Sequence, residues 1–89
     1  MPTISRFSGI LLRMYYDEQK HRIPHVHANV GGKEASFKIR TAEMFEGSIP
    51  AAKADLVRAW IRFHQSELLN NWDRAKLREP LLPIAPLKK

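Results

Sequence analysis

Hydrophobic and polar residues alternate most regularly on either side of a glycine pair near the middle of the chain. Residues 25–30 and 33–40 place an apolar side chain at every second position, and Gly31 and Gly32 lie between them. Glycine readily takes the positive φ angles that a two-residue hairpin loop requires. The pattern predicts an antiparallel hairpin with one apolar face. The pairs expected on this face are Val30 with Lys33, Ala28 with Ala35 and Val26 with Phe37, with Ile39 continuing it.

The same register collects polar side chains on the opposite face of this hairpin. The pairs expected there are His25 with Lys38, His27 with Ser36 and Asn29 with Glu34, with Arg40 beyond them. Residues two apart on a strand share a face, so His25 and His27 can act on one small target. Two histidines, a lysine, a serine and an arginine are predicted to share one surface.

The rest of the chain predicts a strand before the hairpin and a helix after it. Residues 4–16 are apolar around Gly9 and indicate a central strand, and residues 43–47 suit a short strand or a turn. After Pro50, which a first helical turn tolerates, apolar residues recur at three- and four-residue spacing. These positions are Leu56, Val57, Trp60, Ile61, His64, Leu68 and Trp72. We expect a helix from near Ala51, bent or broken around residues 69–72, that continues to Lys76.

These elements predict an α+β fold class. The expected architecture is a small, mostly antiparallel sheet of three to four strands with one long C-terminal helix, single or bent into two, packed on one face. Residues 1–79 are expected to form a single domain. Residues 80–89 contain three prolines and two lysines, which predicts an extended, proline-rich basic tail.

Charge narrows the expected partners. Fifteen Lys and Arg residues against nine Asp and Glu residues produce a net charge of +6, which attracts RNA or an acidic protein. The chain has no cysteine, which excludes disulfides, thiolate metal sites and a cysteine nucleophile. It shows neither a signal-peptide pattern nor an apolar run long enough to span a bilayer. We therefore expect a cytoplasmic protein without membrane association.

The histidine-rich segment at residues 21–27 carries the candidate chemistry. Imidazole exchanges protons near neutral pH, so His25 and His27 suit the general base and general acid of RNA cleavage through the 2′-hydroxyl. That reaction needs no cofactor, but it needs cations near the phosphate oxygens. The phosphate-binding candidates are Lys38, Arg40 and Arg22. On this interpretation the protein is a metal-independent endoribonuclease.

Other interpretations of the histidines stay open. His21, His25 and His27 are a possible ligand set for zinc or nickel. In a further alternative the histidines are structural, and the basic surface binds an acidic protein or nucleic acid without catalysis. His64 lies in the apolar stripe of the helix, where it is either a core residue or a third catalytic histidine that emerges near His21 or His25.

Five separated motifs, in order, carry a resemblance to a known family. They are Met1-Pro2-Thr3-Ile4-Ser5-Arg6-Phe7, Arg13-Met14-Tyr15-Tyr16, Pro24-His25-Val26-His27-Ala28, Trp60-Ile61-Arg62-Phe63-His64 and Glu67-Leu68-Leu69-Asn70-Asn71-Trp72. From Met1 to about Pro86 the chain resembles the bacterial family catalogued as domain of unknown function 4160. The resemblance implies a short stand-alone protein encoded beside a protein of domain-of-unknown-function family 2442, as in a toxin and antitoxin pair. We therefore expect a toxin-like protein that acts on RNA and has a small acidic antitoxin-like partner.

Overall fold

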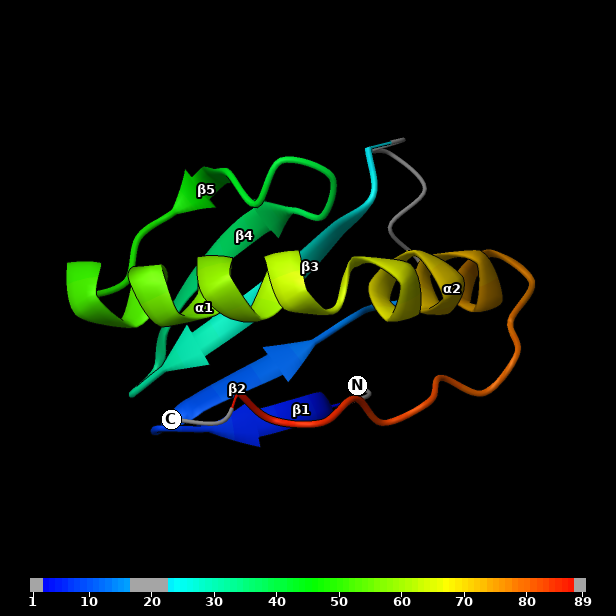
Figure 1. Ribbon diagram of the computed structural model, residues 1–89, viewed down its shortest axis with the longest axis horizontal. Coiled ribbons are helices and arrows are strands. Elements are labelled where there is room, and N and C mark those ends of the chain that lie inside the picture. The colour runs from blue at the N-terminus through cyan, green and yellow to red at the C-terminus, as the bar shows by residue number, and fades with distance from the viewer. Residues whose placement is uncertain (1–2, 17–22, 88–89) are drawn as a thin grey trace.

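The computed structural model describes residues 3–16 and 23–87. In these two ranges the elements are β1 (Thr3–Phe7), β2 (Ile10–Arg13), β3 (His25–Val30), β4 (Lys33–Lys38), β5 (Met44–Gly47), α1 (Ala51–Phe63) and α2 (Gln65–Lys76). The strands form one antiparallel sheet in the order β1-β2-β3-β4-β5. The helix α1 crosses one face of this sheet, and α2 follows at its end (Figure 1). The α+β class is confirmed, with five strands and two helices where three to four strands and one long helix, single or bent into two, were expected.

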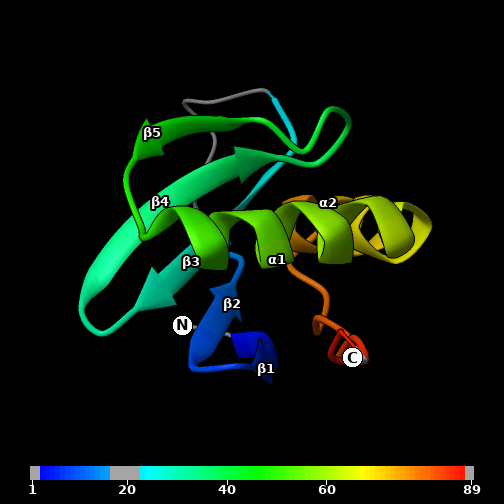
Figure 2. The same cartoon turned by 60° about the vertical axis from the view of Figure 1, so that its left-hand side comes forward.

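The hairpin formed by β3 and β4 has the predicted register. All six predicted pairs are present, from Val30 with Lys33 at the loop to His25 with Lys38 at the far end. The apolar face is fully buried at Val26 and Phe37, and burying a side chain of this size stabilises the fold by roughly 1.5–3 kcal/mol. Figure 2 shows α1 as a layer in front of the sheet, between β1 and β2 on one side and β4 and β5 on the other.

The first apolar stretch folds back on itself, so the prediction of a single central strand at residues 4–16 was wrong. Ser8 and Gly9 have φ angles of 50° and 75°, and Phe7 pairs with Ile10 across this two-residue loop. Apolar residues on both sides of the loop hid it in the sequence, since serine seldom takes a positive φ. As a result β1 is an edge strand, and β2 pairs with β3.

The helix breaks at His64, ahead of the expected break at residues 69–72. His64 has a φ of −119° and a ψ of 30°, which are not helical values. The Nε2 atom of Gln65 donates to the carbonyl oxygens of Ile39 and Arg40, at 3.0 and 2.9 Å. These bonds hold the start of α2 against the two residues that follow β4. The predicted position was wrong because these contacts join distant parts of the chain and leave no trace in the helical periodicity.

Residues 79–87 form neither helix nor strand and return along the helices toward β1 (Figure 1). Hydrogen bonds with α1, α2 and β1 hold them, among them Asn71 Nδ2 to the Leu82 carbonyl (2.8 Å), the Leu82 amide to Asn71 Oδ1 (2.9 Å), Trp60 Nε1 to the Ala85 carbonyl (2.9 Å) and the Ile84 amide to the Ile4 carbonyl (2.8 Å). The Ile84 side chain is buried in the core. This segment therefore contributes to the same hydrophobic core as the sheet and helices.

Candidate functional site

His25 and His27 lie side by side on the face of β3 opposite Val26, here called the histidine face. Their ring centroids are 5.3 Å apart. Alternation along the strand puts both rings on this face, together with Ser36 and Lys38 of β4. The side chains differ in exposure, because His25 is 1% exposed and the His27 side chain is 13% exposed. The structure brings the two predicted histidines together, and of the two His27 is the more accessible.

The ring of His25 is packed among other aromatic rings. Its centroid lies 5.0 Å from that of Trp72 in α2 and 5.6 Å from that of Phe45 in β5. Its Nδ1 atom is 2.8 Å from the carbonyl oxygen of Ile23. A carbonyl oxygen only accepts hydrogen bonds, so Nδ1 donates and carries a proton. His25 thus joins the start of β3 to β5 and α2.

The ring of His27 is oriented by a carboxylate and an aromatic side chain. Its Nδ1 atom lies 2.9 Å from Oε2 of Glu34 and 3.2 Å from Oγ of Ser36. The Tyr15 ring meets it nearly edge-on, with centroids 4.4 Å apart. A carboxylate accepts the Nδ1 proton, which puts the lone pair of the neutral imidazole on Nε2. A carboxylate on Nδ1 is how a catalytic histidine is held in the tautomer that accepts a proton.

Arg13 is the site residue that the sequence did not indicate. It pairs with His27 in the register of β2 and β3, so the two side chains share the histidine face. Arg13 is half-buried, its buried Nε has no hydrogen-bond partner, and no carboxylate pairs with it within residues 3–16 and 23–87. A half-buried charge without a counterion favours the binding of an anion. Its place beside His27 follows from the turn that separates β1 from β2, which the sequence pattern did not predict.

The predicted phosphate-binding cations lie in different settings. Lys38 is half-buried, and its Nζ atom is 3.5 Å from Oε1 of Glu43 and 6.0 Å from the ring centroid of Phe45. Arg40 lies beyond the end of β4 and is exposed. Arg22 falls outside the described residues. Lys38 is thus the predicted cation that the structure places beside the histidines.

The metal alternative stays a prediction. Across the two described ranges, no group of three or more His, Asp or Glu side chains is placed to hold a metal ion. His25 and His27 are close enough to act together, but His21, the third residue of the proposed ligand set, falls outside those ranges.

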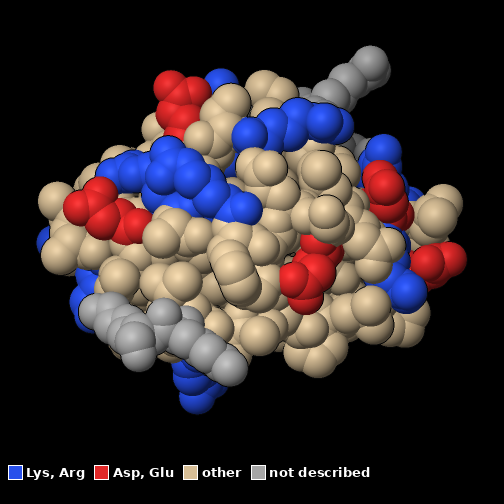
Figure 3. Space-filling model, viewed as in Figure 1, with Lys and Arg blue, Asp and Glu red and all other residues tan. Residues whose placement is uncertain are grey.

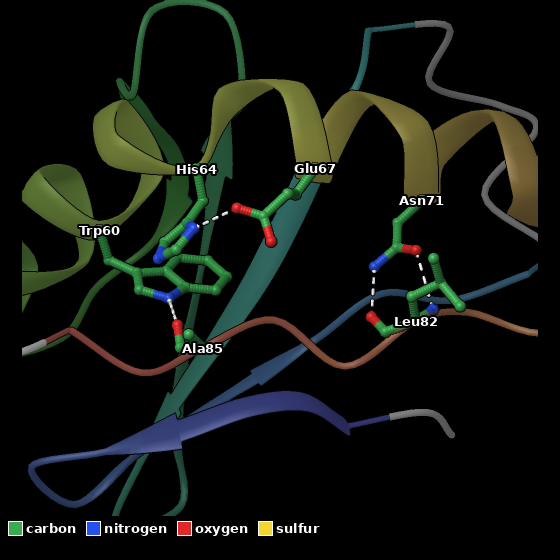
Figure 4. A network of polar contacts seen from close by, with 6 residues as sticks. All are labelled: Trp60, His64, Glu67, Asn71, Leu82 and Ala85. Atoms are coloured by element: carbon green, nitrogen blue, oxygen red, sulfur yellow. Dashed lines mark hydrogen bonds and ion pairs between the residues drawn. The ribbon is translucent and has the colours of Figure 1, made fainter.

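His64 occupies a separate place, at the junction of α1 and α2. It is 6% exposed, its Nδ1 atom is 2.5 Å from Oε1 of Glu67, and its buried Nε2 has no hydrogen-bond partner among the described residues (Figure 4). Its ring contacts are with Trp60 and Phe63. No contact links it to the pair on β3 within the part of the chain that the structure describes. The structure therefore does not bring the third predicted histidine to the other two.

Charge on the face that carries α1 is mixed. Lys and Arg side chains gather above the helix, toward β4 and β5, and Asp and Glu side chains lie among them (Figure 3). This face does not offer a continuous cationic surface. Neither helix, at 13 and 12 residues, is long and apolar enough to cross a membrane.

Comparison with known proteins places the chain in a family. The model of the family described as "Domain of unknown function (DUF4160)" matches residues 9–73, a range that includes Arg13, the histidine face and His64. No curated protein and no solved structure matches the chain. As the five sequence motifs predicted, the chain belongs to the DUF4160 family.

Proposed function

We propose that this protein is an RNA-cleaving domain, the toxin-like member of a two-component module, with His27 as its reacting group. One observation carries the proposal: a histidine with Glu34 on Nδ1 lies beside Arg13, a half-buried cation without a carboxylate partner in the described residues. Glu34 orients the His27 ring as a general base is oriented, and Arg13 favours a bound anion. Cleavage of a phosphodiester by a neighbouring hydroxyl needs both a base and a cation.

The reaction uses the 2′-hydroxyl of RNA as its nucleophile. His27 Nε2 takes the 2′-hydroxyl proton, the 2′ oxygen forms a bond to phosphorus, and the bond from phosphorus to the 5′ oxygen breaks. The 5′ oxygen takes a proton from water, and protonated His27 returns its own proton to solvent. The products are a 2′,3′-cyclic phosphate and a 5′-hydroxyl. Arg13, on the β2 side of the histidine pair, and Lys38, on the β4 side, stabilise the charge that develops on the phosphate oxygens.

His25 acts in this proposal through His27. A ring that is 1% exposed does not reach a polymer, but at a centroid distance of 5.3 Å it limits how far the His27 ring can turn. His25 is thus a positioning residue. His64 has no part in the reaction, because it contacts neither of these rings within the described residues.

The toxin-like role includes a partner of opposite charge. A net charge of +6 favours association with a small acidic protein. Such a partner would inhibit cleavage by covering Arg13 and Lys38 on the histidine face.

The test is cleavage of single-stranded RNA by the purified protein and by matched variants. His27→Ala should lower the rate by about 10²- to 10⁴-fold, and Glu34→Gln should lower it less because the imidazole remains. The control is Glu67→Gln, which alters the carboxylate of the other histidine–glutamate pair and should leave the rate unchanged. A folded His27→Ala variant that cleaves at the wild-type rate would refute the proposal.

A second candidate function, a non-catalytic binding module, is favoured by the burial of His25 among the rings of Trp72 and Phe45. In this reading the histidines hold the sheet together, and the cations bind nucleic acid or an acidic protein. Wild-type protein that binds RNA without cleaving it, and whose affinity is unchanged in His27→Ala, would select this function.

A further inference from the structure

Two half-buried aromatic residues flank the histidines without joining the hydrophobic core. Tyr15 contacts His27, and Phe45 contacts His25 with their ring planes at 90°. Their sequence neighbours Tyr16 and Met44 pack against the core instead. Adjacent residues of an extended chain point to opposite faces. Tyr15 and Phe45 therefore belong to the histidine face, one on each side of the histidine pair.

Each of these rings lies beside a cation. Arg13 precedes Tyr15 by two residues and is next to the same histidine, His27. On the other side, Nζ of Lys38 lies 6.0 Å from the ring centroid of Phe45. A ring beside a cation matches the two parts of a nucleotide, because bases stack on aromatic rings and phosphates pair with cations. The arrangement occurs on both sides of the proposed reacting group.

We propose that the substrate is single-stranded RNA, held by an unpaired base that stacks on Tyr15 and by the adjoining phosphate at Arg13. This inference rests on the proposed function, for which it names the form of the substrate. In a duplex the bases are stacked on one another and paired, so none is available to an aromatic side chain. Phe45 extends the same surface beyond His25 and suits a second base.

Packing explains why Tyr15 is suited to this role. Its ring is held against His27 at a centroid distance of 4.4 Å, so less conformational freedom is lost when a base stacks on it. The same contact places the bound nucleotide next to the imidazole that is proposed to take its 2′-hydroxyl proton. One residue thus serves both to bind the strand and to position it.

The experiment measures binding without cleavage, by fluorescence anisotropy with a labelled 2′-O-methyl RNA oligonucleotide. The single strand is compared with its duplex and with a strand that carries one abasic position. We expect the duplex and the Tyr15→Leu variant each to show an affinity lower by roughly 5- to 100-fold. Tyr15→Phe should keep the wild-type affinity. The control is Phe63→Leu, which alters an aromatic residue that is 78% exposed at the end of α1 and should have no effect.

The abasic strand tests the inference without any change to the protein. Wild type should bind the abasic strand more weakly than the intact strand. If the missing base is the one that stacks on Tyr15, the Tyr15→Leu variant should bind the two strands with equal affinity. Equal affinity for single strand and duplex, or an affinity unaffected by both Tyr15→Leu and the abasic position, would overturn the inference. Base-dependent binding of the 2′-O-methyl strand, with no cleavage of unmodified RNA, would support the inference while refuting the proposed nuclease. Equal cleavage of single strand and duplex would overturn it and leave the nuclease intact.

Discussion

Replacing Asn71 by alanine should release residues 79–87 from α2. Asn71 is fully buried, and its amide group both donates to and accepts from the backbone of Leu82, at 2.8 and 2.9 Å (Figure 4). These two bonds fix the middle of the segment to α2, beyond the bonds that Arg74 makes with Glu79 and Pro80 at its start. Alanine can neither donate nor accept at this position, so both backbone groups of Leu82 lose their partner.

The expected loss of stability follows from these two bonds. A hydrogen bond contributes about 0.5–1.5 kcal/mol net, and a buried group left without a partner costs about 1–3 kcal/mol. Because Leu82 is 45% exposed, water can reach part of its backbone, so the lower end of the second range applies. The cavity left by the shortened side chain adds to the loss. We expect the free energy of unfolding to fall by about 2–4 kcal/mol, a large part of the roughly 5–15 kcal/mol typical of a domain.

The assay is urea unfolding followed by circular dichroism, with hydrogen exchange measured at the amide of Ile84. Exchange at Ile84 should accelerate in Asn71→Ala, because its bond to the Ile4 carbonyl depends on the same segment. The matched control is Asn70→Ala, which changes the exposed neighbour on α2 and should shift stability by less than about 0.5 kcal/mol. If Asn71→Ala lowered the free energy of unfolding by no more than Asn70→Ala does, these bonds would not be what holds the segment.

Three further changes test the packing around the site. Gly47→Ala should lower the free energy of unfolding by about 2–5 kcal/mol, because φ is +73° and the new Cβ would lie 2.2 Å from the Glu34 carbonyl oxygen. The control Gly31→Ala has open space around it and should lower this free energy only by about 1–2 kcal/mol, through backbone strain. Equal losses in urea unfolding would contradict this expectation. Trp60→Phe removes the bond to the Ala85 carbonyl and should lower the thermal midpoint of unfolding by about 4–8 °C for each 1 kcal/mol of stability lost. An unchanged melting curve would mean that this bond does not stabilise the fold. Gln65→Ala removes the two bonds to the carbonyl oxygens of Ile39 and Arg40, after β4, and should destabilise the fold by roughly 1–3 kcal/mol. An unaltered urea midpoint would contradict this.

Local pattern was sufficient for the β3–β4 hairpin and for the histidine face. Alternation with a period of two assigns every side chain to one face, and the pair Gly31 and Gly32 sets the loop. Together they allow a single register, which places His25 and His27 as predicted. The start of α1 at Ala51 and the end of α2 at Lys76 were also predictable, since Pro50 and the spacing of apolar residues are local signals.

Contacts between distant segments settled the remaining features. The turn at Ser8 and Gly9 has no strong local signal, so neither the β1–β2 pairing nor the place of Arg13 beside His27 was accessible from the pattern. The break at His64 is accompanied by hydrogen bonds from Gln65 at the start of α2 to the carbonyl oxygens of Ile39 and Arg40, just after β4. Periodicity along a chain indicates which side of a helix or strand faces the core. Only the packing of the elements determines which residues of other elements lie against each side. For that reason the two histidines of the face could be named from the sequence, but not the burial of His25 or the position of Arg13 beside His27.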